Sequence, residues 1–235
     1  MAVSQVFFTS AKSAEWQQVF DLYEKALDLR ASKISKPGGK KSLIELDKWY
    51  QEELPAAIGE REPKYLTKDE LTKLMKWKLS RGKFRPRLTE LVQTNDEKLV
   101  ESASTKAFKC VSNNLKKAIK ELCILKAVGP ATASAILAAG APEHAPFMAD
   151  ESMNSVPGIG PLKYTEGQYE DFSDEIRECV KRLQNEGLSD WTPHKVELTL
   201  WTHFIINQMK PDLLKGIKRS STDSEDGNKK RLKKS

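Results

Sequence analysis

The most specific segment of this 235-residue chain reads Leu122-Cys123-Ile124-Leu125-Lys126-Ala127-Val128-Gly129-Pro130-Ala131-Thr132-Ala133. Its pattern predicts an apolar helix, a short turn containing Val-Gly, and a second helix rich in small residues. Such a turn directs unpaired amide groups and a positive helix N-terminus outward, where a phosphate oxygen can bind. The alternative is a helix–turn–helix corner that serves only packing.

Helical periodicity extends over almost the whole chain, and no stretch alternates polar and apolar residues as hairpin strands do. A helical pattern runs through residues 13–30. Capping-box pairs predict helix starts at Ser42 and Thr67, with ends at Pro55 and Gly82. Two further helix starts are predicted, at Asp96 and at Thr192.

The fold class that follows is all-α. We expect one domain over residues 1–211, with its hairpin at 122–136, and a disordered basic tail over residues 212–235. The tail offers few apolar side chains to bury, and ordering each of its residues costs on the order of 1–2 kcal/mol of backbone entropy.

Positive charge is concentrated in two places, although the formal net charge is only +6. Residues 73–87 hold seven basic side chains and no acidic one, and residues 210–235 hold nine basic and four acidic side chains. Local positive fields of this kind favour a polyanion partner, whereas a solvated helix face is the alternative. Trp77 and Phe84 lie among these charges, where they either stack on bases or pack into the core. The candidate phosphate ligands in this segment are Lys76, Lys78, Arg81, Lys83, Arg85 and Arg87.

Composition excludes several classes of protein. The three cysteines have no disulfide-framework or zinc-site spacing, and the three histidines form no ligand cluster. No apolar stretch approaches the roughly 20 residues that span a bilayer, and no secretory signal is readable. We therefore expect a soluble intracellular protein, monomeric, with no metal, no cofactor and no membrane partner.

The hairpin resembles that of the helix-hairpin-helix family, whose pattern is roughly Leu-x-Gly-hydrophobic-Gly-x-x-Thr/Ala-Ala. The matching residues are Leu125, Val128, Gly129, Thr132 and Ala133, and Ala127 stands where the first glycine usually lies. The resemblance implies that DNA phosphates bind at the turn. The residues implied in this contact are Lys126, Val128, Gly129, Ala131 and Thr132.

The resemblance extends to the DNA glycosylase branch of that family, in which a catalytic aspartate follows the hairpin. Asp150 lies nineteen residues after Ala131, behind the short apolar run 146–149. Ala131 occupies the place of the lysine nucleophile of glycosylase-lyases, and alanine cannot form a Schiff base. Only Cys179 follows Asp150, so the iron–sulfur cofactor of some members is not implied.

The resemblance thus implies a monofunctional base-excision enzyme in which Asp150 is the catalytic carboxylate and the target base is flipped from duplex DNA. An aspartate that begins a helix is, however, usually an N-cap, and this alternative stays open for Asp150. A catalytically inactive nucleic-acid-binding module, or a protein-interaction module on the same scaffold, is the alternative for the whole chain.

The tail carries two basic clusters typical of a bipartite import signal, which predicts an import receptor as partner and residence in the nucleus. A basic arm that adds nonspecific nucleic-acid affinity is the alternative. The clusters consist of Lys218, Arg219, Lys229, Lys230, Arg231, Lys233 and Lys234.

Overall fold

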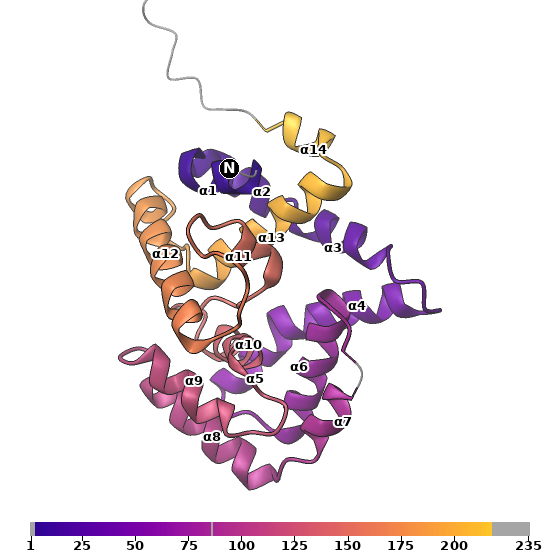
Figure 1. The fold of residues 1–235 in the computed structure, drawn as a ribbon, viewed down its shortest axis with the longest axis vertical. Coiled ribbons are helices and arrows are strands. Elements are labelled where there is room, and N and C mark those ends of the chain that lie inside the picture. The colour runs from indigo at the N-terminus through magenta and orange to yellow at the C-terminus, as the bar shows by residue number, and fades with distance from the viewer. Residues whose placement is uncertain (1–2, 86, 218–235) are drawn as a thin grey trace, which may run out of the picture.

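The computed structural model describes residues 3–85 and 87–217, and within them every regular element is a helix (Figure 1). The all-α prediction is therefore confirmed for this part of the chain. The elements are α1 (Val3–Ser10), α2 (Ser13–Phe20), α3 (Tyr23–Ala31), α4 (Gly39–Lys48), the π-helical turn η1 (Trp49–Glu53), α5 (Leu54–Gly59), α6 (Lys68–Arg81), α7 (Leu88–Gln93), α8 (Glu97–Cys110), α9 (Leu115–Cys123), α10 (Pro130–Gly140), α11 (Asp150–Asn154), α12 (Glu166–Asn185), α13 (Pro193–Met209) and α14 (Asp212–Lys215).

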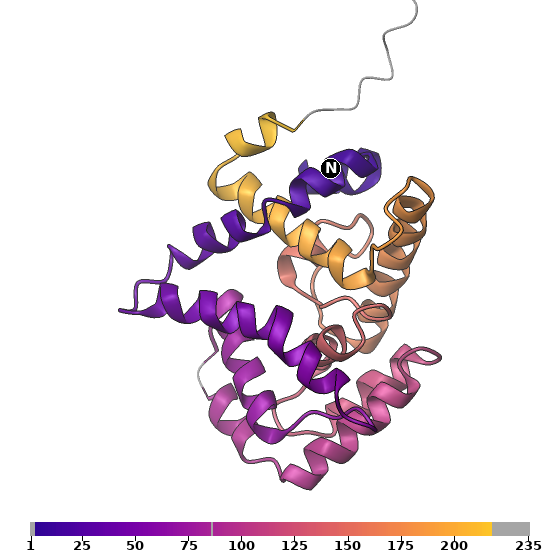
Figure 2. The same ribbon diagram turned by 180° about the vertical axis from the view of Figure 1, so that it is seen from behind.

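Two helices organise the packing. Helix α13 contacts α1, α2, α3, α11 and α12, and most of its side chains are buried. Helix α10 contacts α5, α6, α8 and α9 in the other half of the molecule, as Figures 1 and 2 show. The small residues of α10 allow this close approach, because a Cβ atom added at Gly140 would collide with the ring of Phe108.

Helix starts that depend on local side chains lie where the sequence predicts them. Thr67 caps α6 and forms a capping box with Glu70, and α6 ends before Gly82. The side chains of Asp96 and Thr192 each accept one hydrogen bond from a backbone N–H in the first turn, and so cap α8 and α13.

Three helix boundaries differ from the prediction. Helix α4 begins at Gly39, so Ser42 lies inside it and caps nothing. Pro55 does not end the helical stretch, because α4, η1 and α5 follow one another without a break and the π-helical turn η1 lies directly before α5, which contains Pro55. The pattern at 13–30 forms two helices, α2 and α3, separated at residues 21–22.

The two ends of the described chain meet (Figures 1 and 2). Arg182 of α12 donates hydrogen bonds to the carbonyl oxygens of Ala11 and Phe8, at 2.9 and 3.0 Å. Helix α14 lies in the segment expected to be disordered, and its Leu213 and Leu214 pack against the core. The remaining tail, including all seven residues of the import signal, lies outside the described residues.

In the described ranges, no helix has the length and apolar character needed to cross a membrane.

A candidate nucleic-acid site at the hairpin

The hairpin predicted at 122–136 is formed by α9, a turn and α10. Asn95 clamps the turn, because its side-chain amide accepts from the N–H of Lys126 at 2.8 Å and donates to the Lys126 carbonyl at 3.0 Å. Ala127 adopts a φ of 64°, the left-handed conformation that favours glycine. The turn therefore holds a residue with a Cβ atom in a backbone conformation that carries strain.

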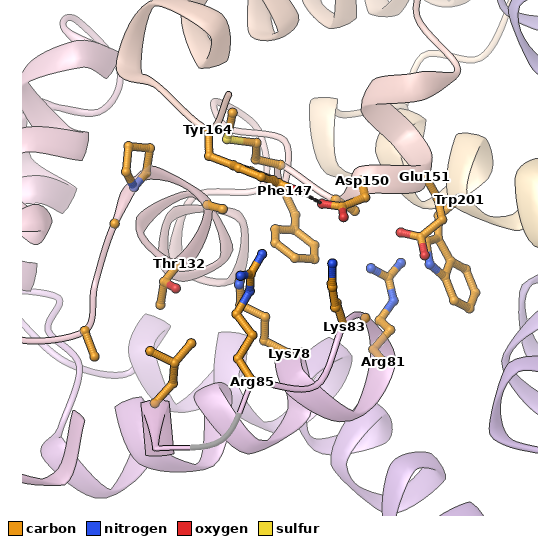
Figure 3. A pocket seen from close by; sticks show the side chains of 18 of the residues that line it. Lys78, Arg81, Lys83, Arg85, Thr132, Phe147, Asp150, Glu151, Tyr164 and Trp201 are labelled. Carbon is orange, nitrogen blue, oxygen red and sulfur yellow. Dashed lines mark hydrogen bonds between the residues drawn. The ribbon is translucent and has the colours of Figure 1, made fainter. Parts of the chain in front are cut away.

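A cavity of about 550 Å³ opens beside this turn, and we call it the hairpin cavity (Figure 3). Three segments that are distant in the sequence border it. The hairpin contributes Ala127, Gly129, Pro130, Ala131 and Thr132; α6 and the loop after it contribute Lys78, Arg81, Gly82, Lys83 and Arg85; the third segment contributes Phe147, Met148, Ala149, Asp150 and Glu151. Arg30, Leu88, Tyr164 and Trp201 complete the lining.

Asp150 is the first residue of α11, and its side chain does not cap that helix. Its carboxylate instead accepts a hydrogen bond from the hydroxyl of Tyr164, with 3.0 Å between Oη and Oδ1 (Figure 3). The N-cap interpretation of Asp150 is therefore wrong. Burial and the neighbouring Asp150 raise the pKa of Tyr164, so its phenol stays protonated and remains a donor at neutral pH.

The backbone before Asp150 is attached to the two helices around it. Ser134 of α10 accepts a hydrogen bond from the N–H of Met148 at 2.9 Å. The hydroxyl of Tyr169 in α12 donates to the carbonyl oxygen of Pro146, also at 2.9 Å. These bonds place the apolar run 146–149 against the hairpin and bring the Asp150 carboxylate to the cavity.

Gln168 organises the loop that carries Tyr164. Its side-chain oxygen accepts from the N–H groups of Lys163 and Tyr164, at 2.7 and 3.1 Å. Its side-chain nitrogen donates to the carbonyl oxygens of Ile159 and Pro161, at 3.0 and 2.8 Å. The Pro-Gly-rich stretch at 157–161 is thus an ordered loop without regular helix.

The basic segment divides into residues that line the cavity and residues that do not. Lys83 and Arg85 are exposed and line it, and Lys78 is half-buried within it. Lys76 and Arg87 are exposed but lie outside the lining.

Arg81 differs from the expectation of a surface phosphate ligand, because it is only 2% exposed. Its guanidinium packs 4.1 Å from the centre of the Trp201 ring, and its Nη2 lies 3.8 Å from Oε1 of the buried Glu197. Cation–π contact and a buried counter-charge therefore retain Arg81 at the wall of the cavity. Arg81 nevertheless lines the cavity, and its role as a phosphate ligand stays a prediction.

The two aromatic residues of the basic segment have different environments. Trp77 is fully buried, stacks on Tyr50 with 3.5 Å between ring centres, and donates from Nε1 to Asp47 at 2.8 Å. The core-packing alternative is correct for Trp77. Phe84 is 75% exposed on the loop between Lys83 and Arg85, and stacking on bases stays a prediction for it.

The local electrostatics follow from burial. Burial lowers the pKa of Lys78, while the Asp150 carboxylate opposes that change. Burial raises the pKa of Glu151, which lies between Asp150 and Trp201 in the view of Figure 3. The cavity thus combines the exposed cations Lys83 and Arg85 with a carboxyl group, that of Glu151, whose pKa is raised by burial.

Sequence reasoning missed several residues of the site. Glu151 adjoins Asp150 in the chain and Phe147 lies three residues before it, so both could have been found from it. Nothing in the sequence marks Asn95, Tyr164 or Trp201, because their roles depend on contacts with distant segments.

Across the described part of the chain, no group of three or more His, Cys, Asp or Glu side chains is placed to hold a metal ion. Comparisons of the chain with family models, with curated proteins and with solved structures give no match.

Proposed function

We propose that the protein binds duplex DNA over the hairpin cavity and that the cavity receives a nucleotide extruded from the base stack. One observation carries the proposal: the hairpin turn, the basic loop and the Asp150 carboxylate border a single cavity. Its volume of about 550 Å³ lies within the range of roughly 300–1,000 Å³ typical of small-molecule sites.

The phosphates would be held from two sides. On one side, α10 begins without a side-chain cap, so its positive end stays available to an anion, although Pro130 has no N–H and the N–H of Thr132 bonds to the Gly129 carbonyl oxygen at 2.9 Å. On the other side, the exposed cations Lys83 and Arg85 supply charge-assisted hydrogen bonds. Lys76, Arg87 and Lys126, exposed farther out, extend the positive surface.

The interior of the cavity suits a base and its sugar. The ring of Phe147, although only 5% exposed, borders the cavity and supplies an apolar wall against which an extruded base can pack. The Asp150 carboxylate would then stabilise the positive charge that develops on the sugar as the glycosidic bond breaks, or activate the attacking water. We therefore propose a monofunctional base-excision activity with Asp150 as the catalytic carboxylate.

The test compares the wild-type protein with Asp150→Asn on duplexes that carry uracil, hypoxanthine, alkylated purines or mismatches. Released bases are counted by strand scission in hot alkali. Asparagine keeps the volume of aspartate but removes its charge, so we expect base release to fall by roughly two to three orders of magnitude. Asp171→Asn is the matched control, because Asp171 is exposed on α12 and does not line the cavity.

Base release that survives Asp150→Asn would contradict the catalytic role of Asp150. Salt-dependent DNA binding with no release from any substrate would favour a non-catalytic nucleic-acid-binding module on the same site.

A further inference from the structure

A second cavity, of about 640 Å³, lies between α3, α4 and the start of α13, and we call it the α3–α4 cavity. The apolar part of its wall consists of Phe20, Tyr23, Leu27, Ile44 and Leu198. Gln51 fixes the polar part, because its side chain donates to the hydroxyl of Tyr23 at 3.1 Å and bonds to Nε2 of His194 at 2.9 Å. The cavity therefore has a wall that is already ordered without a ligand.

Negative charge is in excess around this cavity. The charged side chains that line it are Glu24, Asp28, Asp47, Glu52, Lys48 and Lys195. Asp28 and Lys195 are already paired, with Lys40 and Asp190 respectively. Glu24 and Glu52 are exposed, and within the described ranges no hydrogen bond or ion pair engages either carboxylate. A ligand that combines positive charge with an apolar group is therefore complementary to the cavity.

The chain itself carries a segment of that chemistry, outside the described residues. Residues 229–234 read Lys-Lys-Arg-Leu-Lys-Lys, in which five cations surround one leucine. Helix α13 connects the cavity, at its first turns, with α14 at its other end, and its 17 residues extend over about 25 Å. An extended chain between Ile217, the last described residue, and Lys229 spans up to about 40 Å. Residues 229–234 can therefore reach the cavity, whereas Lys218 cannot.

We propose that residues 229–234 bind in the α3–α4 cavity of the same chain, with their cations at Glu24 and Glu52 and with Leu232 against the apolar wall. Exposed ion pairs are individually weak, so a free basic peptide would gain little affinity there. A tethered segment needs less, because the linker holds its local concentration on the order of millimolar. While bound, the cluster is withheld from nucleic acid and from an import receptor. This inference does not depend on the proposed base excision.

The test is cross-linking of the full-length protein with a carbodiimide, which joins a carboxylate to an amine only where the two are in contact. An equal mixture of unlabelled and isotope-labelled protein separates links within one chain from links between two chains. We expect mass spectrometry to find amide bonds within one chain, from Glu24 or Glu52 to a lysine of residues 229–234. Their yield should exceed that at Glu90 and Glu97, which are exposed outside the cavity, by about fivefold or more.

Two variants remove apolar contact but keep every carboxylate and amine: Ile44→Ser in the wall of the cavity and Leu232→Ser in the tail. Each should lower the yield of these links by about threefold or more, because less apolar surface is buried. Leu91→Ser is the matched control and should keep the yield, since Leu91 is 48% exposed on α7 and does not line the cavity.

Three results would overturn the proposal: no link at Glu24 or Glu52, links spread evenly over the exposed carboxylates, or links found only between two chains. A yield that Leu232→Ser leaves unchanged would also overturn it. If Ile44→Ser fails to fold, Leu232→Ser still decides, because that residue lies in the tail.

Discussion

The hydroxyl of Tyr164 donates a hydrogen bond to the carboxylate of Asp150 across 3.0 Å, from a backbone with a φ of 54°. Residues other than glycine rarely adopt this conformation, and it persists only where the surroundings enforce it. Here the four hydrogen bonds of Gln168 provide that enforcement. The loop therefore stores strain to orient one carboxylate.

Removing the Tyr164 hydroxyl should impair catalysis more than stability. Tyr164→Phe loses one hydrogen bond at a half-buried position where water can replace the donor, so the loss of stability should be only about 0.5–1.5 kcal/mol. We expect base release to fall about tenfold or more, while thermal unfolding changes little because the half-buried ring remains. Tyr65→Phe, which does not line the cavity, is the control. Equal rates for Tyr164→Phe and wild type would show that the bond serves only the loop.

DNA affinity should depend steeply on salt. If about five phosphates are neutralised, the logarithm of the affinity should fall with the logarithm of salt at a slope near −4 to −5. The double substitution Lys83→Glu and Arg85→Glu should weaken binding and flatten the slope, as measured by fluorescence anisotropy. Lys25→Glu with Lys48→Glu changes the net charge equally at exposed positions outside the cavity. If both pairs of substitutions weaken DNA binding equally, the affinity depends on the overall charge of the protein and not on the cations of the cavity.

Ala127→Gly should stabilise the protein. The left-handed conformation costs a residue with a Cβ atom roughly 1–2 kcal/mol in the folded state, and glycine removes this cost. Glycine also raises the entropy of the unfolded chain, which cancels part of the gain in stability. We expect the free energy of unfolding to rise by about 1 kcal/mol in urea titrations. Ala14→Gly, on the exposed side of α2, should instead destabilise by about 0.5–1 kcal/mol. A loss of stability in Ala127→Gly would contradict the strain at this turn.

Acid should destabilise the fold through His203. Burial lowers the pKa of His203 to about 4, against about 6.5 in an unfolded chain, and its ring stacks on Phe7. Between about pH 4 and pH 6.5, His203 is protonated in the unfolded state but not in the folded state. Stability present above pH 6.5 is therefore lost as the pH falls toward 4, by about 3 kcal/mol in total.

The measurement is the free energy of unfolding of wild type and His203→Gln at several pH values. The variant should be less stable at pH 7, where the stacking on Phe7 is lost, but the difference should shrink as the pH falls. A difference that stays constant with pH would exclude His203 as the source.

The basic clusters of the tail should direct the protein to the nucleus. Removing residues 218–235 from a fluorescent fusion should shift it toward the cytoplasm, since an import receptor reads such clusters. Replacing only Lys229, Lys230 and Arg231 by alanine tests whether the second cluster is required. Nuclear enrichment that is unchanged by the deletion would favour the alternative, in which the tail is a basic arm that adds nonspecific nucleic-acid affinity.

Local chemistry explains what was predictable. A cap depends on side chains three residues apart, so Thr67 with Glu70 determined the start of α6 from the sequence alone. The same rule was wrong for Ser42, because the helix had already begun at Gly39. The all-α class and the hairpin followed from periodicity, which averages over many residues.

Burial of individual cations was decided only by the tertiary structure. Lys83 and Arg81 are neighbours in one basic segment and have the same sign of charge. Arg81 is buried because α13 places Trp201 and Glu197 against it from about 120 residues away, whereas nothing covers Lys83. No local pattern records which face of α6 another helix covers.

The sequence by itself determined the helical class, the hairpin and Asp150 as a candidate, since each rests on residues close together in the chain. Only the tertiary structure decided that the Asp150 carboxylate accepts a hydrogen bond from Tyr164 instead of capping its own helix. It also decided that Lys78 lines the same cavity as Asp150. Those relationships depend on how α6, α10 and the loop before α12 pack together, and packing is a property of the whole chain.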